Sequence, residues 1–563
     1  MKALFKVLIA ATLTVTATGC EKFLDINSNP NNATSVTPDA LLANALVTTA
    51  ANYTGGVAAG NNYNTYASFV AGYWGKSGTV SGFSPERTYV YNNTYNQTLF
   101  NGTYDNLNDY QIIQTSGATT YPNHAAIARI MKAYNYLLLV DQFGDIPYTE
   151  ALKGLGNTTP KYDKAEDIYK DLVTQLKGAV ADINAVPTDG LAVGVEDVVF
   201  NGNMARWKAF ANSLRLRILL RMSSTSDATR NSYVSTEMTA LQTSAATAAG
   251  GGFIDRDVTV QPTYTANTNQ QNPFYDRYGF AAGATRAQSE YSFIVPTNYI
   301  IRQYTSNSDQ RVTQLYRNGQ TNIAGTKTAT VGIVGTDLGE ANPPQFDPTD
   351  GATVGSRFLQ GGAFLRGATA PTVIMLLSEH LFNKSEAETR TLFTGGDAAA
   401  KQDFLDGIKA SFTQTYRQAA DVPVTLATST AANAPGIAQY NAYITANVGN
   451  ALVDWDAPTT TVREGNDPTA LPATPAVAPP GPARAVTKQE KILYQKYLAE
   501  NTIASTEALA DIRRTGLPRI KLSLQAGANP LPTRLFYPQT ETSTNQANIP
   551  AGATQFTKIF WQM

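Results

Sequence analysis

The chain has 563 residues and a single cysteine, Cys20. No disulfide can form within one molecule, so the fold must be held by its hydrophobic core and its hydrogen bonds. A chain of this length can meet that demand, because large proteins bury about three quarters of the surface that the unfolded chain exposes. Beyond the N-terminal segment, no stretch is apolar over the roughly 18 residues that indicate a membrane helix.

The residues before Cys20, MKALFKVLIAATLTVTATG, resemble a secretory signal. Two lysines open the segment, an apolar stretch covers residues 7–15, and small residues precede the cysteine. The apolar stretch is shorter than the about 20 residues that span a bilayer. A site ending in Gly-Cys resembles the bacterial lipobox, although Ala17 stands where leucine is commoner. We therefore expect residues 1–19 to be a signal peptide and Cys20 to be lipidated. An ordinary signal peptide with an incidental cysteine is the alternative.

Charge and composition limit the classes of molecule that the protein is expected to bind. The formal net charge is −1, which provides no strong field for phosphate groups, so nucleic acid is not an expected partner. Charged residues make up only 15% of the chain, whereas there are 29 tyrosines. Tyrosine combines a large ring with one hydrogen-bonding tip and suits the recognition of neutral polar ligands. A loop-rich surface without a ligand would explain the composition equally well.

Apolar residues at steps of three or four predict a series of helices. A helix begins at Thr37, where a capping residue precedes Pro38 and Asp39. Further helices are expected at residues 123–143, 164–184, 203–222, 371–390, 398–416, 434–446 and 487–513. The three from 123 to 222 recur about every 40 residues, a spacing typical of stacked helix pairs like tetratricopeptide repeats.

Two details of this pattern can be checked against the structure. On the 203–222 helix, Trp207 falls on the apolar stripe, and the arginines are expected largely outside: Arg206, Arg215, Arg217 and Arg221. Between the helices, residues 52–121 and 224–370 are polar and predict long loops, which are often functional. Residues 457–486 are rich in proline and predict an irregular surface excursion.

Four motifs, in order along the chain, carry a resemblance to a known family. They are CEKFLDINSNPNNAT after the signal, VDQFGDIPYTEAL at 140–152, ALADIRRTGLPRI at 508–520 and RLFYPQTE at 534–541. Together they resemble the SusD/RagB family of cell-surface nutrient-binding lipoproteins. The resemblance implies a mainly α fold, with a scaffold of tetratricopeptide-like helix pairs and long loop-rich insertions that carry the ligand site. It divides the chain into a signal peptide (1–19), a lipidated arm (20–36) and one helical binding domain (37–563).

The same resemblance implies a function. The protein would bind an oligosaccharide or another nutrient outside the outer membrane and deliver it to a SusC-like, TonB-dependent transporter barrel on which it sits as a lid. It would be anchored in the outer membrane through its lipid, would need no cofactor, and would catalyse no reaction. A surface glycoside hydrolase and an adhesive or structural surface lipoprotein are the alternatives. The sequence does not identify the ligand.

The residues that could be catalytic, anion-binding or metal-binding are better explained by structural roles. Asp141 and Asp145 could be a carboxylate pair, but Gly144 ends the helix between them, which favours a helix cap and turn over catalysis. The RRTG motif at 513–516 is typical of a helix end, with anion binding as the alternative. Glu379 lies in an apolar helix and is expected to be a satisfied core acid. The two histidines are far apart in sequence and show no metal-ligand spacing, so no metal site and no catalytic residue are predicted.

Ligand binding is instead expected from aromatic side chains in the long loops, because sugars combine apolar C–H faces with hydroxyl groups. Two clusters, at residues 70–91 and 272–280, supply rings together with charged groups. The candidate ligand-binding residues are Tyr73, Trp74, Phe83, Arg87, Tyr89, Phe274, Tyr275, Asp276, Arg277 and Tyr278. Taken singly, each is more often a packing residue than a ligand contact; the prediction rests on the group.

Overall fold

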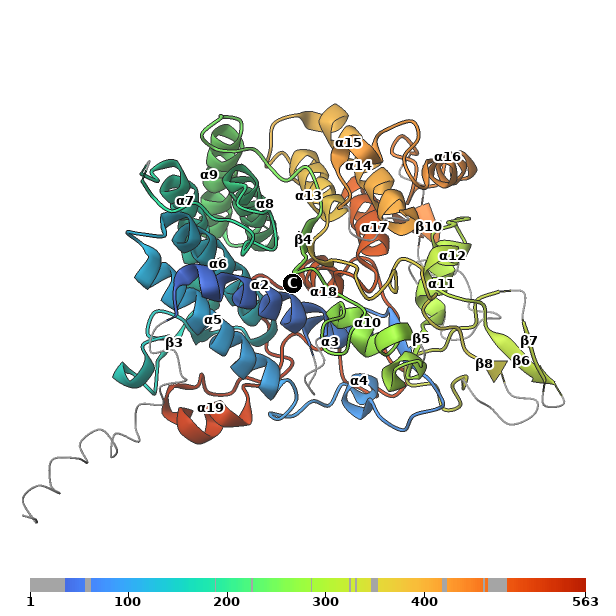
Figure 1. Cartoon of the computed structure of the whole chain (residues 1–563). Coiled ribbons are helices and arrows are strands. Elements are labelled where there is room, and N and C mark those ends of the chain that lie inside the picture. Colours follow the sequence, from blue (N-terminus) through green and yellow to red (C-terminus); the bar gives the residue numbers. More distant parts are fainter. Residues whose placement is uncertain are drawn as a thin grey trace, which may run out of the picture.

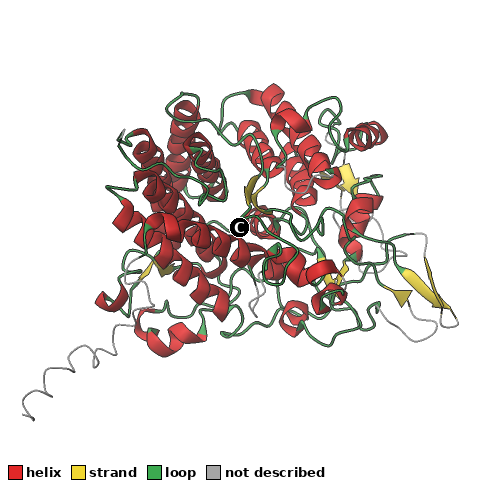
Figure 2. Cartoon of the chain, in the orientation of Figure 1, coloured by secondary structure: helices red, strands yellow, loops and turns green. Residues whose placement is uncertain are grey.

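A computed structural model describes the chain at residues 36–55, 62–187, 189–223, 226–284, 286–323, 326–329, 332–345, 353–417, 423–458, 461–463 and 483–563. Helices dominate these segments, and the strands are short (Figures 1 and 2). The signal peptide, Cys20 and most of the predicted 20–36 arm lie outside the described residues, as does most of the proline-rich stretch 457–486.

The first half of the chain forms an array of helices in which sequence neighbours pack together (Figure 1). Helix α5 packs on α6, α6 on α7, α7 on α8 and α8 on α9, while α2 covers α5 and α6. The bounds are α2 Pro38–Thr54, α5 Gln97–Gly117, α6 Pro122–Phe143, α7 Ala165–Asn184, α8 Met204–Met222 and α9 Ala228–Ala245. This is the packing of stacked helix pairs that the spacing of the sequence predicted.

The helix ends follow local chemistry. Helix α2 begins with proline at its first turn and ends at Gly55, whose φ of 116° belongs to the left-handed region. Helix α6 ends at Gly144, with φ 76°. Helix α8 begins at the cap Asn203, whose side chain accepts a hydrogen bond from the backbone N–H of Arg206. The start of α2, the end of α6 and the start of α8 match the sequence predictions to within one or two residues.

A second helical group is formed by the C-terminal half. Helix α13 packs on α14 and α17, and α18 packs on α17 and on α3 near the N-terminus. Helix α8 contacts both α13 and α18, so it joins the two groups. The bounds are α3 Tyr63–Val70, α13 Leu377–Thr389, α14 Gly396–Tyr416, α17 Lys488–Glu500 and α18 Ser505–Thr515.

Short elements and loops fill the space between and beside the two groups (Figure 1). The short helices are α4 Ser84–Thr88, α10 Pro273–Tyr278, α11 Asn298–Thr305, α12 Val312–Leu315, α15 Leu426–Ser429, α16 Ile437–Ala446 and α19 Gln539–Thr544. The strands form small antiparallel sheets. Four of them are two-stranded: β1 Trp74–Lys76 with β5 Ile294–Pro296, β2 Ile146–Pro147 with β3 Tyr162–Asp163, β4 Val258–Val260 with β9 Thr372–Met375, and β10 Thr461–Arg463 with β11 Ala483–Ala485. In the fifth described sheet, β6 Gln320–Ile323 pairs with both β7 Thr326–Ala329 and β8 Thr353–Val354.

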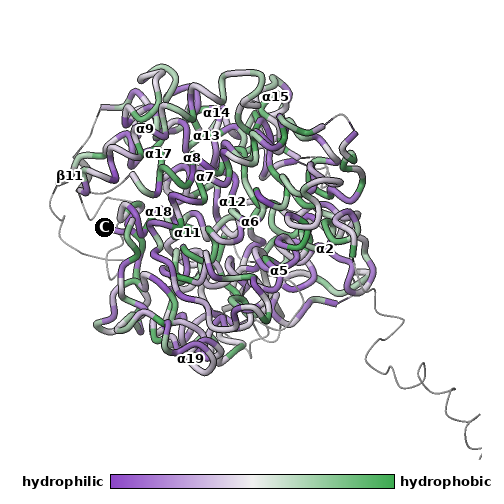
Figure 3. Tube along the Cα trace, turned by 90° about the vertical axis from the view of Figure 1, so that its left-hand side faces the viewer, coloured by the Kyte–Doolittle hydropathy of each residue, from purple (hydrophilic) through white to green (hydrophobic). Residues whose placement is uncertain are grey.

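One large hydrophobic core runs through both helical groups and includes Trp74, Trp207 and Trp561. Along the Cα trace of the chain, hydrophobic and hydrophilic residues are interspersed (Figure 3). Within the described residues, no helix has the length and apolar character needed to cross a bilayer.

Three sequence expectations about secondary structure were wrong. The polar stretches 52–121 and 224–370 contain the long helices α5 and α9, which were hidden because much of their surface carries Asn, Thr, Ser and Gln. The expected helix 487–513 is broken after Glu500 into α17 and α18. Strand β9 occupies the first part of the expected helix 371–390, because these residues pair with β4.

The arginines of α8 were also misplaced by the sequence. Arg215, Arg217 and Arg221 are buried, at 3%, 3% and 4% exposure, because helices pack on several sides of α8. Arg217 donates to both carboxylate oxygens of Glu379, at 2.8 and 2.9 Å, and Arg221 pairs with Asp141 and Glu507. The expectation that Glu379 is a satisfied core acid is confirmed.

Candidate functional site

The two aromatic clusters of the sequence come together in the structure. Trp74 starts strand β1, and its ring centroid lies 6.4 Å from that of Phe274 and 5.2 Å from that of Tyr278, in α10. Phe358 completes the group, at 5.8 Å from both Trp74 and Phe274. Residues about 200 positions apart therefore form one aromatic cluster, which no local sequence pattern could reveal.

Several of the predicted ligand residues lie inside the core. Tyr73 and Trp74 have no exposed surface, and Tyr89 and Tyr278 are 1% exposed. The Tyr73 hydroxyl donates to the carbonyl of Tyr497 at 2.7 Å, and Trp74 Nε1 donates to Thr502 Oγ1 at 2.9 Å. A ligand could reach these rings only if the surrounding chain moved, so in this structure they are core residues; Trp74 and Tyr278 also contact residues that line a pocket, Thr502 and Phe274.

The other predicted residues make specific packing contacts. Phe83 packs on Phe69 at 4.7 Å, and Arg87 donates to Gln525 Oε1 at 2.8 Å. Tyr275 is 6% exposed and Asp276 accepts from Gln271 Nε2 at 2.8 Å, while Arg277 pairs with Glu290 at 2.8 Å. Phe274 differs from all of these because its ring lines a pocket.

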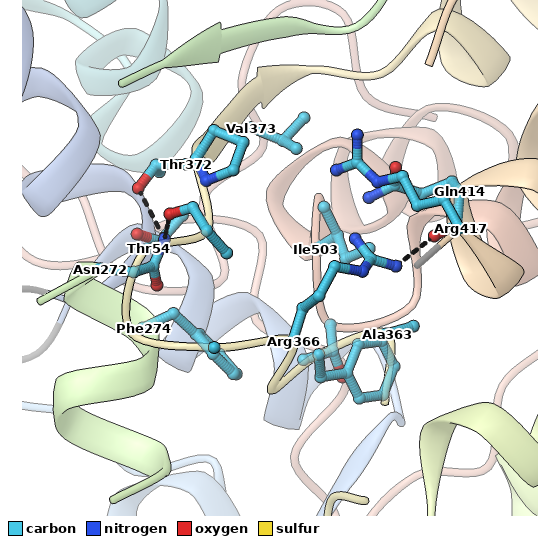
Figure 4. Close-up of a pocket in the computed structure, with 15 residues that line it drawn as sticks. Thr54, Asn272, Phe274, Ala363, Arg366, Thr372, Val373, Gln414, Arg417 and Ile503 are labelled. Carbon is cyan, nitrogen blue, oxygen red and sulfur yellow. Dashed lines mark hydrogen bonds between the residues drawn. The ribbon is translucent and has the colours of Figure 1, made fainter. Parts of the chain in front are cut away.

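That pocket, which we call the Arg366 pocket, is a cavity of about 60 Å³ beside the aromatic cluster (Figure 4). Since one water needs about 10–15 Å³ of such space, it holds a few waters or one small group of a larger ligand. Five separate parts of the chain line it. The lining residues are Thr54, Asn272, Phe274, Ala363, Phe364, Arg366, Gly367, Ala370, Pro371, Thr372, Val373, Gln414, Arg417, Thr502 and Ile503.

One side of the pocket carries neutral polar groups held in place by hydrogen bonds. Asn272 caps α10 by accepting from the N–H of Tyr275 at 3.0 Å, and its Nδ2 donates to the carbonyl of Ala370 and to Thr372 Oγ1 at 2.9 and 3.2 Å. Thr54, in the last turn of α2, donates to the carbonyl of Ala50 at 3.0 Å. This wall is therefore rigid and pre-formed.

The opposite side is cationic. Figure 4 shows Arg366 and Arg417 next to Gln414, across the pocket from Thr54 and Asn272. Arg366 donates from Nη2 to the carbonyl of Gln414 in the last turn of α14, where the helix dipole favours a cation. Burial, reinforced by the neighbouring positive charge of Arg417, lowers the pKa of Arg366.

Thr502, which lies between α17 and α18, also lines the pocket. Its φ is 65°, a left-handed conformation that is unusual for a β-branched residue and must be imposed by the surroundings. Its hydroxyl accepts from Trp74 Nε1 and donates to Asn501 Oδ1 at 3.0 Å, and its carbonyl accepts from Asn64. The buried Trp74 thus positions a residue of the pocket wall.

A second and larger groove, of about 680 Å³, lies near the C-terminus. Tyr91, Phe536 and Tyr537 supply rings to it, and Asn92, Asn93 and Gln546 supply amides. Its lining residues carry no charge. We call it the Phe536 groove and retain it as a second place where a neutral ligand could bind.

The two sharpest sequence motifs are structural, as expected. Asp145 Oδ1 accepts from the N–H of Ala165 at 2.8 Å at the start of α7, and buried Asp141 pairs with Arg221. In RRTG, Gly516 ends α18 with φ 71°, and Arg514 donates to both oxygens of Glu386 at 2.6 and 2.7 Å. Within the described residues, no group of histidine, cysteine and acidic side chains could hold a metal ion.

Sequence reasoning missed most of the Arg366 pocket. Arg366 and Gln414 carried no local signal, and Thr502 was hidden inside what looked like one continuous helix. The polar stretch 224–370 was a useful general guide, because it contributes Asn272, Phe274 and Arg366.

Comparisons with known proteins agree with this architecture. Residues 30–538 match a family model, SusD-like, whose description is "Starch-binding associating with outer membrane". The chain belongs to the SusD-like family. Its members are nutrient-binding proteins associated with the outer membrane, and the resemblance found in the sequence is thereby confirmed.

Solved structures share the fold of this SusD-like chain at low sequence identity. A chitin-binding protein is 20% identical, with a TM-score of 0.66 over 93% of this chain and 100% of its own. A SusD-like protein from Bacteroides thetaiotaomicron has the same identity and TM-score, over 93% of this chain and 99% of its own. A SusD homolog from Bacteroides uniformis is 20% identical, with a TM-score of 0.63 over 93% of this chain and 99% of its own. No curated protein matches the chain.

Proposed function

We propose that this chain is a lipid-anchored protein of the outer cell surface that binds an oligosaccharide and delivers it to a SusC-like, TonB-dependent transporter barrel. The observation that carries the proposal is the family match over residues 30–538, together with a pre-formed polar pocket beside an aromatic cluster. The chitin-binding protein that shares the fold supports an oligosaccharide as the ligand class.

The pocket favours binding over hydrolysis. A glycosidase of the usual kind needs two carboxyl groups about 5–9.5 Å apart around the scissile bond. The described residues that line the Arg366 pocket include no Asp and no Glu. The rings that line it, Phe274 and Phe364, and its amide and hydroxyl groups suit the faces and the hydroxyl groups of a sugar.

Ligand binding is tested by measuring the binding of an oligosaccharide array to the full chain and to Phe274→Ala and Phe536→Ala. We expect Phe274→Ala to weaken the binding of the best ligand at least tenfold, whereas Phe536→Ala, in the Phe536 groove, leaves it within about twofold. The reverse result would move the site to the groove. Failure of every oligosaccharide to bind would overturn the proposed ligand class.

Anchoring and delivery are tested in cells of the source organism. Cys20→Ala should release the protein from the membrane fraction while the purified variant keeps its affinity for the ligand. A tagged wild-type chain should copurify with a TonB-dependent transporter barrel. If no barrel copurifies, an adhesive or structural role becomes the better explanation.

A further inference from the structure

The strongest unexplained feature of the Arg366 pocket is its arginine. Several buried arginines are neutralised: Arg217, Arg221, Arg311 and Arg514 each pair with a carboxylate. Among the described residues, Arg366 forms no salt bridge and makes a single hydrogen bond, to the carbonyl of Gln414. A guanidinium has five N–H donors, so most of its hydrogen-bonding capacity is left for another partner.

The surroundings add to this positive charge. Arg417 also lines the pocket, and its charge acts on Arg366. Among the described residues, Asp257 is a carboxylate that acts on both; it is 2% exposed, does not line the pocket and accepts from the N–H groups of Leu377 at 2.9 Å and Val424 at 3.4 Å. The described lining residues include two arginines and no carboxylate, so an anion that enters the pocket would meet positive charge at Arg366.

The size of the pocket limits what can enter. About 60 Å³ is enough for a carboxylate or a sulfate group and leaves no room for a whole sugar ring. A sugar ring with an exocyclic carboxylate or sulfate could insert that group while the ring stays outside the cavity, and the lining residues Phe274 and Phe364 supply aromatic surface beside it. The planar fork of an arginine matches the two oxygens of such a group.

We propose that the Arg366 pocket binds the anionic group, carboxylate or sulfate, of an acidic oligosaccharide, and that Arg366 is the residue that contacts it. This inference rests on the proposed function, because it specifies the class of oligosaccharide that the protein binds. Asn272 and Thr372 on the opposite wall are placed to bind the hydroxyl groups of the same sugar.

The test is calorimetric titration of the full chain and two variants with matched ligands. The probes are a hexuronate oligosaccharide, its methyl ester, a sulfated oligosaccharide without carboxylates, the desulfated form of that chain and a set of neutral oligosaccharides. The variants are Arg366→Gln, which removes the charge and keeps a planar amide, and Arg519→Gln, a control at an exposed arginine outside the pocket.

We expect at least one acidic oligosaccharide to bind the wild type at least tenfold more tightly than its esterified or desulfated counterpart. Arg366→Gln should abolish that difference, and Arg519→Gln should preserve it. The ester and the desulfated form show whether the anion is a carboxylate or a sulfate. Thermal unfolding of Arg366→Gln without ligand verifies that the variant is folded.

Other outcomes separate the two proposals. If neutral oligosaccharides bind as tightly as acidic ones, or if Arg366→Gln binds the acidic ligand as the wild type does, the inference is wrong and the proposed function stands. If no oligosaccharide binds, or if only an acidic peptide such as oligoglutamate binds, both are overturned.

Discussion

Arg514 and Arg366 show two different uses of a positive charge in this molecule. Arg514, in α18, is 1% exposed and donates to both oxygens of Glu386 and to Asp511. Arg366, at the pocket, donates to one backbone carbonyl. The first arrangement is complete within the protein and serves the fold. The second is incomplete, and a partly buried charge without a carboxylate partner marks a place where a ligand can supply one.

The largest expected effect on stability lies in the paired region. Arg514→Met keeps the length of the side chain but leaves the buried Glu386 without its main partner, so the free energy of unfolding should fall by about 3–5 kcal/mol. Urea denaturation measures the change. In the double variant with Glu386→Gln, the loss should be smaller than the sum of the two single losses. A change below about 1 kcal/mol would mean that the pair contributes little.

Within the aromatic cluster, Trp74 is a core residue, whereas Phe274 lines the pocket where we expect a ligand to bind. Trp74→Ala empties a fully buried position and should lower the free energy of unfolding by about 3–5 kcal/mol. Phe274→Ala, at a ring that lines the pocket, should cost less stability and should cause the larger loss of affinity. Denaturation and calorimetry on the two variants test this ranking. A Trp74→Ala variant of normal stability would contradict the core position of this ring.

Acid should weaken the pair formed by Arg514 and Glu386. Burial alone would raise the pKa of Glu386, but Arg514 outweighs it and lowers the pKa to about 2. Because the folded pKa lies below the ordinary value of a glutamate, 4.5, this stabilisation is complete above about pH 4.5 and is lost as the pH falls toward 2. Unfolding free energies measured from pH 6 to pH 3 should show the loss. Glu386→Gln, which does not titrate, should flatten that part of the profile.

An exposed ion pair provides the intermediate case. Lys401 and Asp456 lie 2.5 Å apart, with 39% and 67% of their side chains exposed. Solvent screens such pairs, so Lys401→Gln should lower the free energy of unfolding far less than Arg514→Met does. Thermal unfolding at low and high salt measures it. A loss as large as that of Arg514→Met would show that exposure does not distinguish the two pairs.

The smallest expected effect on stability is at the pocket. Arg366→Gln removes a charge that is partly desolvated and repelled by Arg417, so the free energy of unfolding should stay within about 1 kcal/mol of the wild type or rise. A loss of 3 kcal/mol or more, measured by urea denaturation, would place Arg366 with the structural arginines and remove the contrast.

Local patterns predicted the scaffold well. The residue spacing located α6, α7 and α8 to within one or two residues, and Gly144 and Gly516 marked helix ends that the structure confirms. These features depend on neighbours in the sequence, which is why they were readable. Helices α5 and α9 were not predicted, because tertiary packing and not a clear apolar stripe holds their polar sequences in place.

The sequence by itself determined the family, the helical scaffold and the absence of a disulfide from a chain with one cysteine. Only the tertiary structure decided which charged and aromatic residues serve the fold and which face a ligand. It buried Arg217 and Trp74, broke a long helix at Thr502, and left Arg366 at a cavity. The physical reason is that a side chain's partners come from segments hundreds of residues away. The same arginine is structural beside a carboxylate and available to a ligand without one.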